Sequence, residues 1–70
     1  MGEIIFEVRE AEEGGYCAKA LGYSIFTQGE DLEDLRVMIQ DTVKCHFENS
    51  KERPSIIRLH FVRDEVFAVA

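Results

Sequence analysis

The chain is poor in several residue types that usually carry structure or chemistry. Its 70 residues include two cysteines, one proline and no tryptophan. Two cysteines cannot form the disulfide framework that stabilises many small secreted domains. No apolar run approaches the ~18 residues that a membrane-spanning helix needs, and the opening sequence MGEIIFEV lacks the basic and long apolar regions of a signal peptide. We therefore expect a cytoplasmic protein that is not attached to a membrane.

Positive charge is also scarce. Eight Lys and Arg residues against 14 Asp and Glu residues give a formal net charge of −6. Residues 1–35 contain nine acids and two bases, whereas residues 36–70 contain five acids and six bases. An acidic surface repels phosphate backbones, which disfavours direct nucleic-acid binding. The same surface attracts a basic partner, or simply keeps the domain in solution.

The length allows a single small domain covering residues 1–70. The composition, 46% hydrophobic and 31% charged, is that of an ordinary folded protein. A chain of this size buries only about 60% of its unfolded surface, so its stability is marginal. Without disulfides, association with a second copy is the simplest way to gain stability, and we expect a homodimer.

The first part of the chain has the two-residue period of β-strands. Strands are expected at residues 3–11, 16–21 and 24–28. In the first of them, Ile4, Phe6 and Val8 point to one face, which predicts one buried side. The Gly-Gly pair in residues 12–15 is typical of a tight turn. These three strands are expected to form an antiparallel meander.

An amphipathic helix is expected next. Apolar residues recur at steps of three and four from Leu32 to Phe47, over about four turns. Asp31 is the expected N-cap, and Asp34 three residues later is a weak form of the capping box. Pro54 and its polar neighbours end the helical pattern.

The last segment returns to a strand pattern. Ile57, Leu59 and Phe61 alternate with Arg58 and His60. After a short charged turn or bulge, the apolar end of the chain is either a hairpin strand or a strand that pairs with another chain. The expected fold is α+β, in the order β-β-β-α-β(-β), with an antiparallel-rich sheet and one helix packed on one face.

The order and spacing of these short patterns resemble the N-terminal domain of HicB-like antitoxins. That family tends to show an acidic Gly-Gly-Tyr turn, then a strand ending in Thr-x-Gly-(Asp/Glu), then Leu-Glu-Glu at the start of the helix. The matching residues are Glu13, Gly14, Gly15, Tyr16, Thr27, Gly29, Glu30, Leu32 and Glu33. The resemblance extends from about Ile4 to Phe61.

The resemblance implies a fold related to ribonuclease H but without that enzyme's catalytic carboxylates. It also implies a role: HicB-like domains bind and mask a small basic ribonuclease toxin, HicA, and a separate domain binds operator DNA. This chain has no segment matching that DNA-binding domain, and it has ALGYS in place of the Pro-rich loop that many members carry between strands two and three. It therefore resembles a stand-alone HicB-like domain.

Few residues suggest catalysis or metal binding. The acids Glu30, Asp31, Glu33 and Asp34 can form a metal or acid/base site, a contact surface, or only the acidic first turn of a helix. Capping and the helix dipole already favour acids there. Ligands from one helix turn rarely surround a cation, so the contact surface is the functional interpretation that we favour.

Other polar and aromatic residues have structural interpretations. The soft ligands lack the paired spacing of zinc sites, and we expect them to be small, partly buried packing residues; they are Cys17, Cys45, His46 and His60. Three phenylalanines are expected to be core residues: Phe6, Phe47 and Phe61. Tyr16, Tyr23 and Phe26 can form an exposed aromatic patch, in which Tyr23 is the expected contact residue.

The expected function is therefore that of a non-catalytic protein-binding module without a cofactor. Its contact residues would be Tyr23, Glu30, Asp31, Glu33 and Asp34. The expected partners are a second copy of the chain and a small basic toxin of the HicA type. The alternative is a homo-oligomeric regulatory domain that binds a small molecule at the boundary between subunits.

Overall fold

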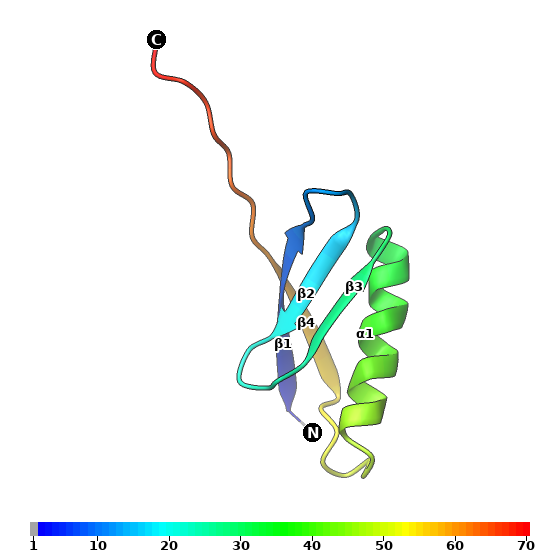
Figure 1. Cartoon of the computed structure of the whole chain (residues 1–70). Helices are drawn as coiled ribbons and strands as arrows, with labels where there is room; N and C mark the ends of the chain where they lie inside the picture. The colour runs from blue at the N-terminus through cyan, green and yellow to red at the C-terminus, as the bar shows by residue number, and fades with distance from the viewer. Residues whose placement is uncertain (1) are drawn as a thin grey trace.

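The computed structural model describes residues 2–70 as a four-stranded sheet with one helix (Figure 1). The elements are β1 (Glu3–Glu10), β2 (Tyr16–Ala20), β3 (Phe26–Gly29), α1 (Leu32–His46) and β4 (Ile56–Phe61). The sheet order is β3-β2-β1-β4, in which β1, β2 and β3 are antiparallel neighbours and β4 is parallel to β1. The predicted α+β class and element order are confirmed.

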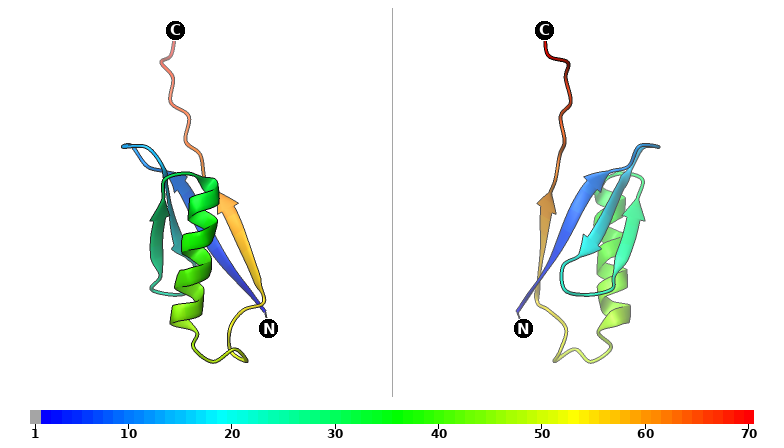
Figure 2. Two further views of the ribbon diagram at one scale, coloured as in Figure 1. Left: turned by 90° about the vertical axis from the view of Figure 1, so that its right-hand side faces the viewer. Right: turned by 60° about the vertical axis from the view of Figure 1, so that its left-hand side comes forward.

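The helix covers one face of the sheet, and the core lies between them (Figure 2). On β1, Ile4, Phe6 and Val8 are buried, as their spacing predicts. The helix contributes Leu35, Ile39 and Val43 at steps of four, which places all three on one side of the helix. The small residues Ala18 and Ala20 on β2 also face the helix and allow it to approach the sheet. One face of every strand is therefore committed to this core.

The helix does not cover the whole sheet equally. It packs against β2 and β3, and β4 lies at the opposite edge of the sheet. As a result Ile57 and Leu59 are only partly buried, and Phe61 is 52% exposed. The prediction that Phe61 is a core residue is therefore wrong, whereas Phe6 is fully buried and Phe47 packs against the core from a partly buried position.

No fifth strand follows β4 in the part of the chain that the structure describes. Residues 62–70 run away from the body without secondary structure (Figures 1 and 2). Val62 still donates its backbone N–H to the carbonyl of Val8 at 2.9 Å, so the β1–β4 ladder ends there. The optional hairpin strand is therefore not formed within the chain.

The prediction that the cysteines and histidines are packing residues is correct only for Cys17, which is partly buried on β2. Cys45, His46 and His60 are exposed. The buried side of the helix runs through Ile39 and Val43, and Cys45, two residues after Val43, falls on the outer side. His46 is the last residue of α1, and its ring lies beside the rings of Tyr23 and Phe47 at the end of the helix. Within residues 2–70, the helix is neither long nor apolar enough to cross a membrane.

Candidate functional site

Acidic residues gather at one end of the molecule, where β1 and β3 end and α1 begins (Figure 1). The strand register explains this, because Tyr16 at the start of β2 lies opposite both Glu10 of β1 and Gly29 of β3. The acidic β1–β2 turn is thereby placed beside the helix start. We call this surface the acidic end; its residues are Glu10, Glu12, Glu13, Glu30, Asp31, Glu33 and Asp34.

Two of these acids are used by the helix cap. Asp31 is the N-cap, and its carboxylate accepts a hydrogen bond from the backbone N–H of Asp34 at 2.7 Å. The Asp34 carboxylate in turn accepts from the backbone N–H of Glu30 at 2.9 Å. This reciprocal pair is a variant of the capping box, as predicted. Glu30 and Glu33 are exposed and do not take part in the cap through their side chains.

A matched pair of substitutions separates capping from contact. Asp31→Ala is expected to lower the free energy of unfolding by about 1 kcal/mol, because it leaves a helix N–H without its partner. Glu33→Gln, in the same turn, is expected to change it by less than about 0.5 kcal/mol. Urea unfolding followed by far-ultraviolet circular dichroism measures both. Equal effects would show that the capping bond carries no stability.

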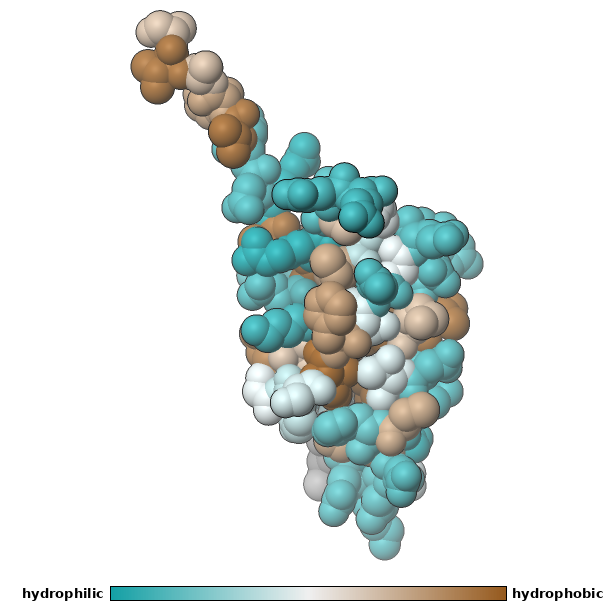
Figure 3. Space-filling model, in the orientation of Figure 1, coloured by the Kyte–Doolittle hydropathy of each residue, from teal (hydrophilic) through white to brown (hydrophobic). Residues whose placement is uncertain are grey.

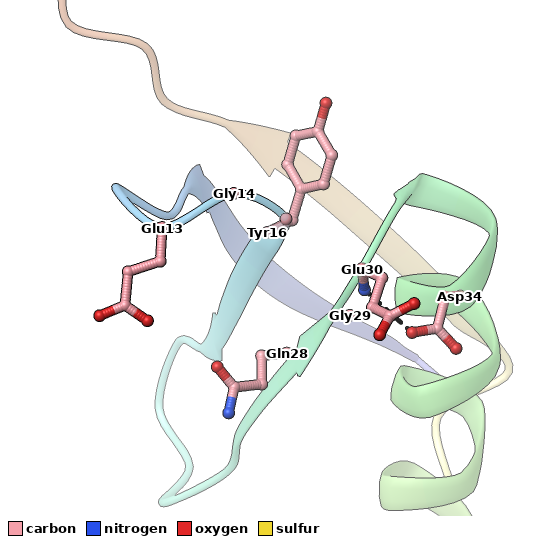
Figure 4. Close-up of a pocket in the computed structure, with 8 residues that line it drawn as sticks. Glu13, Gly14, Tyr16, Gln28, Gly29, Glu30 and Asp34 are labelled. Carbon is pink, nitrogen blue, oxygen red and sulfur yellow. Dashed lines mark hydrogen bonds between the residues drawn. The ribbon is translucent and has the colours of Figure 1, made fainter.

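A shallow hollow of about 440 Å³ lies in the acidic end (Figure 4). It is formed by the Gly-Gly turn, the end of β3 and the first turn of α1, with Tyr16 on one side. Figure 4 shows the Asp34 carboxylate beside the Glu30 backbone and the Glu13 side chain directed away from both. The carboxylates therefore spread along the rim and do not converge on one point.

Two glycines allow the parts of this hollow to meet. Gly15 has φ of +79°, and a Cβ there would lie 2.6 Å from the carbonyl oxygen of Gly29. A Cβ on Gly29 would lie 2.6 Å from the backbone nitrogen of Leu35. Both positions therefore need glycine. Gly15 needs it for its positive φ and for lack of space, and Gly29 needs it for lack of space alone. The glycines of the family-like pattern shape the surface.

The predicted contact residues do not form one surface. Tyr23 lies at the far end of the helix, where its ring packs edge-on against Phe47 at 5.3 Å and against His46 at 5.8 Å between ring centroids. The 15 residues of α1 separate it from the acidic end by about 22 Å. Tyr23 is 42% exposed, but it is a separate feature.

Tyr16, rather than Tyr23, lies at the acidic end. It lines the hollow and packs partly against the core. Its place in the Gly-Gly-Tyr pattern is the sequence signal that points to it. The exposed aromatic patch is not formed, because Tyr16 and Tyr23 lie at opposite ends and the strongly exposed Phe26 is on the sheet face away from the helix.

Several carboxylates of the acidic end have no ion-pair partner among residues 2–70. Among residues 2–70, no ion pair involves the carboxylates of Glu12, Glu13, Glu30 or Glu33. Within the same residues, no group of three or more potential ligands is arranged to hold a metal ion. The arrangement offers an open, negatively charged rim around a shallow hollow, which suits the ammonium or guanidinium groups of a basic protein surface.

Two residues with shifted pKa values form an ion pair at the opposite end of β1. Arg58 on β4 donates a hydrogen bond of 2.8 Å to the Glu3 carboxylate on β1. This bond lowers the pKa of Glu3 below its ordinary value and raises the pKa of Arg58. Since both groups are exposed, water screens their attraction, and the pair contributes little to stability. Its position is consistent with the parallel register of β1 and β4.

These features define a small α+β domain whose distinguishing surface is acidic and concentrated at one end. The chain belongs to the UPF0150 family. It is 48% identical over 67 residues to a UPF0150 protein of Thermotoga maritima, covering 96% of this chain and 93% of that protein. It is 53% identical over 53 residues to a UPF0150 protein of Archaeoglobus fulgidus, covering 76% and 77%. No family model and no solved structure matches the chain.

Proposed function

We propose that this chain is a non-catalytic protein-binding module that masks a small basic protein with its acidic end. The observation that carries the proposal is the open rim of carboxylates that no ion pair neutralises within residues 2–70. The cap bonds hold Asp31 and Asp34 in place, so the rim is preorganised. Such a surface speeds the encounter with a positively charged partner and fixes its orientation.

The resemblance to HicB-like domains supplies the kind of partner. A HicA-type ribonuclease is small and basic, because it binds RNA. Binding of its basic surface to the acidic end would block access of RNA by occlusion and need no chemistry on this chain. The acidic end then competes with the phosphate backbone for the same basic residues of the toxin.

The experiment measures association with a small basic ribonuclease of the HicA type. Glu30 and Glu33 are both changed to Gln, which removes two charges and leaves the cap bonds in place. The matched control changes Glu48 and Glu52, two exposed acids past the far end of the helix, to Gln. The association rate at low salt is expected to fall about threefold to tenfold in the first variant and to stay unchanged in the control.

Inhibition of the ribonuclease is the second measurement. The wild-type chain is expected to inhibit cleavage of RNA by the HicA-type ribonuclease at equimolar concentration. The Glu30/Glu33 variant is expected to need a higher concentration for the same inhibition. Absence of binding, or equal effects of the two variants on the association rate, would contradict the proposal.

A further inference from the structure

The segment after β4 carries apolar side chains that no other part of residues 2–70 covers. The exposed fractions are 93% for Val66, 81% for Phe67 and 98% for Val69. Figure 3 shows hydrophobic atoms on this segment standing clear of the body. We call residues 63–70 the tail. A stretch of this composition with no proline has the character of a strand without a partner.

The neighbouring β4 has a free edge. Ile56 and Val62 donate their backbone N–H groups towards β1, to the carbonyls of Gly2 and Val8. In a parallel ladder the polar groups of alternate residues point to opposite sides. The N–H and C=O groups of residues 57, 59 and 61 therefore point away from β1, to the open edge. Residues 56–61 contain neither a proline nor a bulge that would prevent another strand from pairing at this edge.

The side chains next to that edge are also incompletely covered. A hollow of about 280 Å³ lies between α1 and β4, and its lining includes Ile39, Ile57 and Leu59. At the end of the same strand, Phe61 is 52% exposed. An added strand along β4 would extend the sheet under this side of the helix and cover these residues. The described residues thus include a vacant strand position beside β4 and, in the tail, an uncovered apolar segment that could fill it.

We propose that two copies of this chain exchange their tails, each tail adding as an antiparallel strand to the free edge of β4 in the other copy. Antiparallel pairing about a two-fold axis at Asp64 places Phe67 of one copy opposite Phe61 of the other. Val69 then lies opposite Leu59, beside the hollow. Because residues directly opposite share a face of the sheet, Phe67 and Val69 lie on the helix side.

Two ion pairs and the backbone fit this register. Arg63 of each copy lies opposite Glu65 of the other, which forms two cross-strand ion pairs, and Val62 lies opposite Val66. The two Asp64 residues meet at the axis, where their repulsion works against the pairing, and each Asp64 carboxylate lies 3.7 Å from Nη1 of Arg9 in its own copy. The outward-pointing groups of residues 57, 59 and 61 meet residues of odd number in the tail. If the tail continues the alternation of β4, the odd-numbered residues point their backbone groups to the same side. Both ladders can then form their hydrogen bonds.

A second copy fits better than a folded-back tail or a different protein. The vacancy and the strand that fills it are on the same chain, so each copy completes the other. A two-fold axis generates both tail–β4 pairings at once, so the association stops at a dimer. Folding back instead would require a tight turn at Arg63, Asp64 and Glu65, where no glycine or asparagine is available.

The first test is the state of the full chain in solution. Sedimentation equilibrium of the wild type is expected to give twice the monomer mass of 8.0 kDa. Phe67→Ser is expected to raise the dissociation constant of the dimer at least about tenfold. Phe26→Ser is the matched control, since Phe26 is 65% exposed but lies outside the proposed contact, and it is expected to leave the constant unchanged. A monomeric wild type, or equal effects of the two variants, would overturn the proposal.

The second test determines the register in which the tail of one copy pairs with β4 of the other. In a background with Cys17→Ser and Cys45→Ser, the pair Val62→Cys and Val66→Cys is oxidised and run on a non-reducing gel. Residues 62 and 66 would form a non-hydrogen-bonded pair, whose Cα separation of about 4.5 Å allows a disulfide. We expect a covalent dimer, formed faster than with the offset pair Val62→Cys and Ala68→Cys. A bridge within the monomer would mean a folded-back hairpin and overturn the proposal, as would equal rates for the two pairs.

Discussion

Gly29→Ala is expected to lower the free energy of unfolding by about 3 kcal/mol. The cause is space: an added Cβ would lie 2.6 Å from the backbone nitrogen of Leu35 and 2.7 Å from its Cα. Those atoms belong to the first turn of α1, which the cap bonds of Asp31 and Asp34 hold in place. The strand and the helix must therefore separate, and the fully buried Leu35 loses contacts. Urea unfolding at one fixed protein concentration measures the change.

Gly22→Ala is the control for this substitution. Gly22 has φ of +85°, but a Cβ there meets nothing within 4 Å. The expected cost is only the strain of a left-handed alanine, about 1 kcal/mol. A Gly29→Ala variant as stable as the wild type would show that the helix can move away from β3 without loss. That result would also remove the structural reason for glycine at this position.

Phe6→Ala is expected to have the larger effect, a loss of about 3–5 kcal/mol. Phe6 is 0% exposed and lies on β1, between Ala20 of β2 and Leu59 of β4. Removal of its ring leaves a cavity that the two neighbouring strands and the helix cannot close without losing their pairing. A domain of this size has a total stability of roughly 4–10 kcal/mol, so the variant is expected to be largely unfolded at 37 °C. Thermal unfolding by circular dichroism measures this.

Phe26→Ala provides the comparison with the same chemical change. Phe26 is on β3 and 65% exposed, on the face of the sheet away from the helix. Its loss is expected to cost less than about 1 kcal/mol. Similar melting temperatures for the two variants would contradict the assignment of the core to the helix side of the sheet.

Local patterns determined much of the fold. The alternation of Ile4, Phe6 and Val8 has one solution, since a one-residue slip would expose all three. The helix start was also predictable, because Asp31 and Asp34 lie at the spacing that satisfies free N–H groups. Such rules involve residues a few positions apart, and the sequence displays them directly.

Features that depend on distant residues were not predictable in the same way. Phe61 continues the alternation of Ile57 and Leu59, yet it is half exposed. The helix packs over β2 and β3, whereas β4 lies at the opposite edge of the sheet. No property of residues 55–61 reveals where the helix axis falls. His46 keeps the helical spacing of Ile39 and Val43, yet it is exposed as the last residue of α1.

The acidic end was partly predictable. Its helix-start residues are contiguous in sequence, but the contribution of Glu13 and Tyr16 depends on the register that places β2 beside Gly29. Tyr23 was expected to share a contact surface with these acids. The strand β3 runs between them and carries the chain to the opposite end of the molecule, which separates the two.

The parallel pairing of β1 with β4 has a consequence for how the protein acquires its shape during synthesis. Glu3 lies beside Ile56, so the central strand of the sheet, made first, waits for a partner made more than fifty residues later. The meander and the helix involve only nearby residues and can assemble earlier, whereas joining β4 to β1 closes a long loop. Until that moment one edge of β1 is unprotected. The last of the four strands to be made is therefore the one that covers β1, and the open edge of the sheet then passes to β4.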